Sequence, residues 1–132
     1  MITITAADVV GAENATALTM TKVTSDINKE TITVSGFDGN TDSFMVVEIP
    51  AAASGSVYQL SEVFGDYAGK TGESGKIDLT KGKTNFIRVN GRNVKTAEGT
   101  AVFKLNGESP AVDLSDQNIY VGFVNMKNAI AH

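Results

Sequence analysis

The residue types that carry out catalysis are sparse in this chain of 132 residues. Cysteine is absent, and the single histidine, His132, is the final residue, where nothing holds it beside a substrate. A serine or cysteine nucleophile needs a neighbouring base, and neither pair can be built here. One terminal imidazole also falls short of a metal site, so we interpret it as an incidental tail residue. The sequence predicts no catalytic residues and no enzyme activity.

The segment Asp38-Gly39-Asn40-Thr41-Asp42 places oxygen-bearing side chains at alternate positions, as the start of a calcium loop does. The sixth position of such a loop is glycine and the twelfth is a bidentate glutamate, but Ser43 and Ile49 stand there. We therefore interpret the segment as a hairpin turn and expect no metal or cofactor site, while calcium binding by this loop stays open.

Gly69-Lys70-Thr71 matches the end of a phosphate-binding loop. The pattern requires a glycine five residues earlier, where the chain has Phe64. The following stretch, Gly72-Glu73-Ser74-Gly75, breaks the helix that such a loop must enter. We expect a flexible connection at this point and no bound nucleotide.

Several carboxylates lie in loop-like stretches and are of the residue type that glycosidases use in pairs. They are Glu62, Asp66, Glu73, Asp113 and Asp116. No other feature of the sequence supports such a pair. Sugar sites usually carry aromatic platforms, yet the chain has no tryptophan, and we expect Tyr58 and Tyr120 to lie in strands, in the core or half-buried. Asn14-Ala15-Thr16 has the form of a glycosylation sequon, which has meaning only after export. A non-catalytic carbohydrate- or ligand-binding module remains an alternative function.

The charge of the chain argues against nucleic acid as a partner. The formal net charge is −4, and the basic residues are scattered, without interleaved aromatics. Met1-Ile2-Thr3-Ile4-Thr5 lacks the basic start and the long apolar stretch of a signal peptide, and no segment approaches the about 20 apolar residues of a membrane span. We expect no membrane association and folding in a cytoplasm, unless a leader has been removed.

Short runs of β-branched and aromatic residues recur between clusters of Gly, Asn, Asp and Ser, a spacing typical of a sandwich or a barrel. Ala101, Phe103 and Leu105 are expected to point to one face of a strand and Val102 and Lys104 to the other. Phe44-Met45-Val46-Val47 is instead continuous, as in a central strand covered on both sides. The predicted strands are 31–35, 43–49, 56–60, 76–79, 84–89, 100–105 and 119–124, with 17–23 as a further candidate.

Turn and helix signals complete the pattern. Turns are predicted at 36–40, 72–75, 81–82, 90–91 and 106–107, where residues tolerate positive φ. Thr5 to Gly11 is a helix candidate, because Thr5 and Asp8 match a capping box and Gly11 could end the turn. Leu60 to Tyr67 is a second candidate, with a loop as the alternative.

We expect residues 26–132 to form the β-sandwich domain. Residues 1–25, rich in Ala and Thr, are predicted to be an arm that becomes ordered on a neighbouring molecule, or else an edge segment of the sandwich.

The order of features between Asp42 and Met126 resembles that of the head-decoration (cement) proteins of tailed bacteriophages. An aspartate precedes an apolar strand, a polar strand enters a Lys-Gly-Lys turn, and a strand ending in Arg precedes two further strands. The matching segments are Asp42 to Ile49, Lys76 to Lys83, Asn85 to Val89, Gly99 to Leu105 and Ile119 to Val124.

This resemblance implies an all-β fold, an immunoglobulin-like β-sandwich, with a small β-barrel as the alternative. It also implies a virion structural protein on the capsid exterior, made in the host bacterial cytoplasm. Its partner would be the phage major capsid protein, and the chain would bind either as a monomer or as a homotrimer. A phage tail or baseplate component is a second alternative. The family shares no catalytic residues, so no site residues are carried over.

Overall fold

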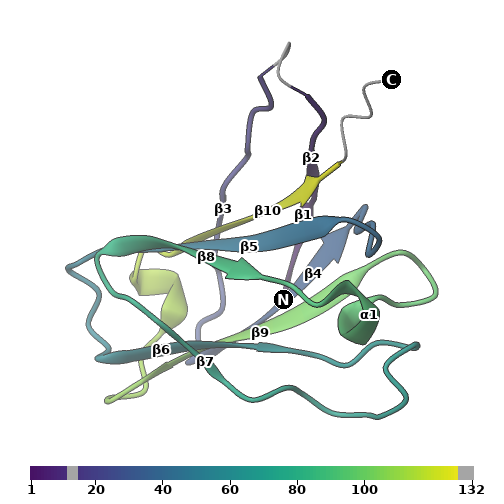
Figure 1. Cartoon of the computed structure of the whole chain (residues 1–132). Helices are drawn as coiled ribbons and strands as arrows, with labels where there is room; N and C mark the ends of the chain where they lie inside the picture. The colour runs from purple at the N-terminus through teal and green to yellow at the C-terminus, as the bar shows by residue number, and fades with distance from the viewer. Residues whose placement is uncertain (12–14, 128–132) are drawn as a thin grey trace.

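Two β-sheets lie face to face in the computed structural model, which describes residues 1–11 and 15–127 (Figure 1). Sheet A has the order β1 (Ile2–Thr5), β4 (Lys29–Ser35), β9 (Ala101–Glu108), β6 (Val57–Glu62) and β7 (Ile77–Leu79). Sheet B has the order β2 (Ala7–Val9), β10 (Tyr120–Met126), β5 (Asp42–Ile49) and β8 (Lys83–Arg88), and β3 (Thr21–Lys22) also pairs with β10. The described helical segments are α1 (Gly91–Val94) and the 3-10 turn η1 (Leu114–Asp116).

The predicted all-β sandwich with little helix is confirmed, and the predicted strands from residue 31 onward correspond to β4 through β10. The strand order differs from the A-B-E-D and C-F-G order of an immunoglobulin constant domain. Only the β6–β7 connection stays within a sheet in this part of the chain, because each of the other connections from β4 to β10 crosses to the opposite sheet. Two sheets formed in this way share one core.

Side chains on the inner faces follow the predicted period of two. Ala101, Phe103 and Leu105 of β9 are fully buried, as are Val121 and Phe123 of β10. The rings of Phe103 and Phe123 lie 5.9 Å apart between their centroids and join the two sheets. Phe37 packs edge-on against Phe123 at 5.6 Å. Each aromatic pair adds about 1 kcal/mol to the burial of its area.

The N-terminal segment adds edge strands to both sheets. β1 runs parallel to β4 in sheet A, and β2 runs parallel to β10 in sheet B, with Ala6 alone between β1 and β2. The predicted helix at Thr5 to Gly11 is therefore wrong. Strand pairing satisfies more backbone groups here than one helical turn would. The side chain of Asp8, which the helix prediction used as a capping residue, accepts a hydrogen bond from Asn125 Nδ2 at 2.9 Å.

Two further local signals have other outcomes. Leu60 to Tyr67 forms no helix: β6 continues to Glu62, and the alternative, a loop, follows it. The predicted turn at Asn106-Gly107 lies inside β9. Gly107 is required there for packing, since a Cβ atom would stand 3.0 Å from Tyr58 Cε1 and 2.9 Å from Val112 Cγ2.

Glu30 holds the chain where it enters β4. Its side chain is buried, and one carboxylate oxygen accepts hydrogen bonds from the backbone N–H groups of Thr24 and Ser25, both at 3.1 Å. The other oxygen lies 2.7 Å from the amino group of Met1. A buried carboxylate with several donors fixes the turn between β3 and β4.

Glu62, at the end of β6, gives a pH-dependent test of the fold. Burial raises the pKa of its carboxyl above the ordinary 4.5, although the Asn90 N–H donates to it. The folded state therefore holds this proton more tightly than the unfolded state, and the associated stability is lost as the pH rises through the raised pKa. We expect Glu62→Gln to increase the urea midpoint at pH 7 and leave it unchanged near pH 3; equal effects at both values would contradict this origin.

Candidate interaction surface

The outer face of sheet B carries apolar side chains in neighbouring registers. Phe44 of β5 lies opposite Val124 of β10, and Val46 of β5 lies opposite Phe86 of β8. Phe86 is 66% exposed, and Met126, at the end of β10, is 38% exposed. A sheet face that points to water usually alternates to polar residues at these positions, so this set is unusual for a solitary domain. We call these five residues the sheet B face.

Part of sheet B is covered by the segment that leads into β3. The side chains of Leu18 and Met20 lie over Gly122, where a Cβ atom would stand 2.7 Å from Met20 Sδ and 3.1 Å from Leu18 Cδ1. Gly122 is the neighbour of Val46 in the register, and Val46 is 1% exposed although it points outward. The lack of a side chain at Gly122 therefore lets the chain's own segment sit on the sheet.

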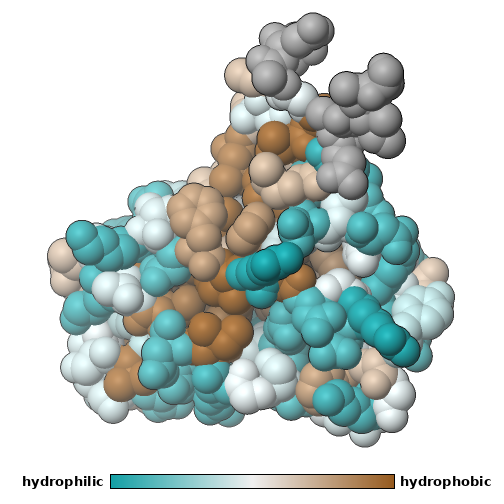
Figure 2. All heavy atoms as spheres, viewed as in Figure 1, coloured by the Kyte–Doolittle hydropathy of each residue, from teal (hydrophilic) through white to brown (hydrophobic). Residues whose placement is uncertain are grey.

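Phe86 and Met126 of the sheet B face remain exposed, Phe44 and Val124 are half-buried, and the face adjoins a projection. Figure 1 shows β2 and the described part of the chain that leads into β3 standing away from the sandwich beside the end of β10. In Figure 2, apolar side chains gather over the region of β5, β8 and β10 and continue up the base of this projection, where Val10 is 56% exposed. Contiguous apolar surface of this kind marks binding sites for other macromolecules.

Charged groups border the sheet B face along β8, which pairs with β5 alone among the described strands. Arg88 Nη2 lies 2.7 Å from Asp42 Oδ1 at one end, and Lys83 is exposed at the other. Charges on an edge strand hinder indiscriminate strand addition. The arrangement of an apolar centre with a charged border is that of a selective protein interface.

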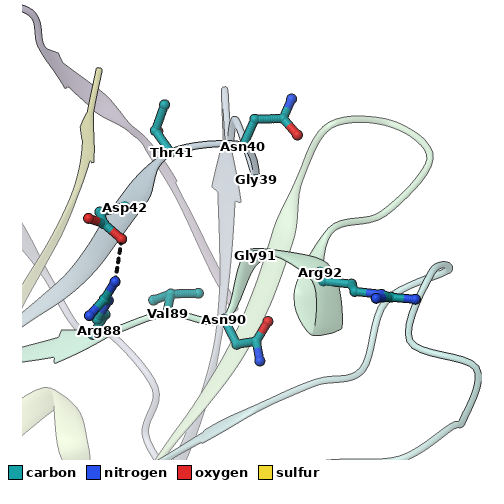
Figure 3. A pocket seen from close by; sticks show the side chains of 9 residues that line it. All are labelled: Gly39, Asn40, Thr41, Asp42, Arg88, Val89, Asn90, Gly91 and Arg92. Atoms are coloured by element: carbon teal, nitrogen blue, oxygen red, sulfur yellow. Dashed lines mark hydrogen bonds and ion pairs between the residues drawn. The ribbon is translucent and has the colours of Figure 1, made fainter. Parts of the chain in front are cut away.

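A polar groove of 660 Å³ adjoins this border, between residues 39–42 and 88–92 (Figure 3). The close-up shows Arg88 reaching toward Asp42, while Arg92 extends away from the groove and Asn40 points outward. The side chains that line it do not converge on one point, so the groove extends the surface without forming a catalytic centre.

The segment from Asp38 to Asp42, which has the form of the start of a calcium loop, has both of its carboxylates paired with cations. Asp38 pairs with Lys127, at the end of β10, and Asp42 pairs with Arg88. The hydrogen bond from Lys127 lowers the pKa of the Asp38 carboxyl, and the same bond raises the pKa of Lys127. Within residues 1–11 and 15–127, no group of three or more acidic or histidine side chains is placed to hold a metal ion.

The remaining sequence candidates are dispersed over the molecule. Gly69, Lys70 and Thr71 lie in the connection between β6 and β7, and the Lys70 ammonium stands 4.6 Å above the Phe64 ring instead of facing a helix N-terminus. Tyr58 is buried and Tyr120 is half-buried, as predicted. His132 and Asn14 lie outside the described residues.

Most of the carboxylates considered for a glycosidase pair have local structural partners. Asp66 accepts from the Ala97 N–H at 2.6 Å, and Asp113 accepts from the Ser115 N–H at 3.0 Å, at the start of η1. Glu73 accepts from Ser61 and Lys104, and these bonds lower the pKa of its carboxyl. Such carboxylates serve as caps and ion-pair members.

The comparisons with known proteins supply no relative: no protein-family model, curated protein or solved structure matches the chain. In the part of the chain that the structure describes, no helix has the length and apolar character to cross a membrane.

Sequence reasoning identified β5 but not the surface on it. The continuous run Phe44-Met45-Val46-Val47 was interpreted as a strand covered on both sides, and β5 is indeed central in sheet B. The signal for this surface is Phe86 of β8, because it lies beside Val46 in the register and its side chain is 66% exposed.

Replacing Gly122 by valine tests the covering segment. We expect Gly122→Val to displace Leu18 and Met20 from sheet B and to lower the free energy of unfolding by about 1–3 kcal/mol. Limited proteolysis should then cleave within residues 15–20 faster than in the wild type. Gly75→Val is the matched control, since nothing lies within 4 Å of a Cβ atom there; equal cleavage rates in the two variants would contradict the proposed contact.

The Asp38–Lys127 pair gives a second pH-dependent test. The lowered pKa of Asp38 means that its contribution to stability is present above the unfolded value of 3.8 and is lost as the pH falls through the lowered folded pKa. We expect Asp38→Asn to lower the thermal midpoint at pH 7 and to have little effect at pH 2. An unchanged midpoint at pH 7 would show that the pair does not stabilise the folded chain.

Proposed function

We propose that this chain is a virion structural protein that decorates the outer surface of a tailed-phage head and stabilises it. The observation that carries the proposal is the apolar sheet B face, with Phe86 and Met126 exposed and a charged border along β8. The order of sequence features between Asp42 and Met126, which resembles that of head-decoration proteins, supports the same assignment.

The chemistry of this face suits a protein partner. A stable interface buries about 800 Å² on each side, and a few central aromatic residues supply most of its energy. Phe86 is the exposed aromatic residue of the face, next to Val46 and on the same strand as Arg88. Its large ring can enter an apolar pocket of the partner while Arg88 and Lys83 remain at the border.

The proposed partner is the phage major capsid protein, and the proposed location is the capsid exterior, after folding in the host bacterial cytoplasm. A rigid sandwich needs contact area for this role and no reactive group. Binding as a homotrimer would place some of the apolar surface between copies of the chain.

Co-sedimentation with undecorated capsids tests the proposal. We expect the wild-type chain to pellet with capsids at micromolar concentration and Phe86→Asp to bind at least about tenfold more weakly, the effect of losing a central aromatic residue. Tyr67→Asp is the matched control, because Tyr67 is 58% exposed and lies in the β6–β7 connection. Failure of the wild-type chain to pellet would overturn the proposal.

The same assay separates the alternatives. Pelleting with purified tails and not with heads would identify a tail or baseplate component. Sedimentation velocity of the free chain distinguishes a monomer from a homotrimer. If both variants bind like the wild type, the capsid contact lies away from the sheet B face.

A further inference from the structure

The outer face of sheet A, on the opposite side of the sandwich, is polar and holds a small cavity. The cavity has a volume of 180 Å³ and crosses β4, β9 and β6. Lys29, Asn106 and Gln59 form one row across these strands, and Lys104 and Ser61 belong to the next row. Asn106 of β9 lies at the centre of this arrangement.

The carboxamide of Asn106 has no hydrogen-bond partner in the described part of the chain. The residue is 6% exposed, and both its Oδ1 and its Nδ2 are buried and unpaired. Buried side-chain amides are normally satisfied, and an unsatisfied one costs about 1–3 kcal/mol. Asn125 provides a contrast within the same molecule, since its buried amide bonds to Ser43, Asp8 and the Gly36 carbonyl.

Neighbouring side chains are already committed to other bonds. Gln59 Nε2 donates to Asp78 Oδ1 at 2.8 Å, and Ser61 Oγ donates to Glu73 Oε1 at 2.7 Å. Lys104 Nζ lies 3.2 Å from Glu73 Oε2. These contacts hold the walls of the cavity in place around Asn106, which lines it with an unpaired amide.

The cavity is positively charged although the chain is acidic. Three lysines and one glutamate line it, whereas the whole chain has a net charge of −4. Lys104 is neutralised by Glu73, but the Lys29 and Lys76 ammonium groups have no ion-pair partner among the described residues. An anionic group is therefore favoured next to Asn106.

We propose that this cavity binds an acidic peptide segment of another protein by the side chain of an aspartate or glutamate. The carboxylate accepts hydrogen bonds from Asn106 Nδ2 and from the ammonium groups of Lys29 and Lys76. A main-chain N–H of the same segment donates to Asn106 Oδ1. One acidic residue thus satisfies both halves of the buried amide, which a simple anion cannot do.

The lining favours a peptide over an acidic sugar. A volume of 180 Å³ admits one side chain, and no aromatic residue among the lining side chains offers a platform for a sugar ring. Because the cavity is on sheet A, it stays accessible when the sheet B face is covered. The proposal is therefore independent of the capsid assignment and gives the domain a second partner.

Titration followed by the side-chain NH2 resonances tests the proposal. The probe is acetyl-Ala-Asp-Ala amide, and acetyl-Ala-Asn-Ala amide is the neutral control. We expect saturable shifts of the Asn106 amide with the aspartyl peptide, weakened by added salt, and no saturation with the control. The absence of saturable shifts up to about 10 mM aspartyl peptide, a concentration beyond ordinary weak binding, would overturn the proposal.

Variants separate binding from folding. We expect Asn106→Leu to raise the thermal midpoint, because it removes an unsatisfied buried group. The same change should lower the affinity for the aspartyl peptide at least about fivefold. Lys29→Gln and Lys76→Gln should also lower this affinity. Lys83→Gln removes an equal charge from β8 and should leave the affinity unchanged. Unchanged affinity in Asn106→Leu would overturn the site. Tighter binding of glucuronate than of the peptide at Asn106 would overturn the ligand class.

Discussion

The contact between Phe103 of β9 and Phe123 of β10 is the point on which the arrangement of the sandwich depends. β9 and β10 are consecutive in the chain but belong to opposite sheets. The two rings lie 5.9 Å apart between their centroids and are fully buried. Phe37 closes the same cluster from the connection after β4. Because side chains alternate along a strand, fixing these inward residues also fixes which residues of β9 and β10 point outward. The composition of both outer faces follows from this core.

The two outer faces have opposite chemistry. On sheet B, Val124 follows Phe123 and points to the apolar side, next to Phe44. On sheet A, Lys104 and Asn106 flank Leu105 and point to the polar side. A domain that used its sandwich only for stability would need neither an exposed Phe86 nor an unsatisfied Asn106, since both lower its stability or solubility. The two proposals assign a partner of different chemistry to each departure, an apolar protein surface to sheet B and an acidic peptide segment to sheet A.

The fold was predictable from the sequence to the extent that side-chain alternation determines it. Ala101, Phe103 and Leu105 indicated the inner face of β9 without any structural information, and the all-β sandwich followed. The N-terminal strands were not predictable, because Thr5 to Gly11 has local helix signals and becomes β2 only through pairing with β10. The same limit applies to Asn106-Gly107, a turn signal that the inward packing of Tyr58 overrides. For the candidate surface, the sequence shows the apolar run of β5. It does not show how much of this run is exposed, because that depends on where Leu18 and Met20 pack on sheet B.

The parallel pairing of β2 with β10 has a mechanical consequence. Ala7 lies beside Val124 and Val9 beside Met126, so the two strands point in the same direction. Tension that draws the start of β2 and the end of β10 apart therefore acts along the strands and loads all of their backbone hydrogen bonds at once. Such shear requires simultaneous rupture, whereas a hairpin pulled from its open end loses one bond after another. The short N-terminal strands thus resist forced unfolding more than their length suggests, a useful property for any domain attached to a surface under strain.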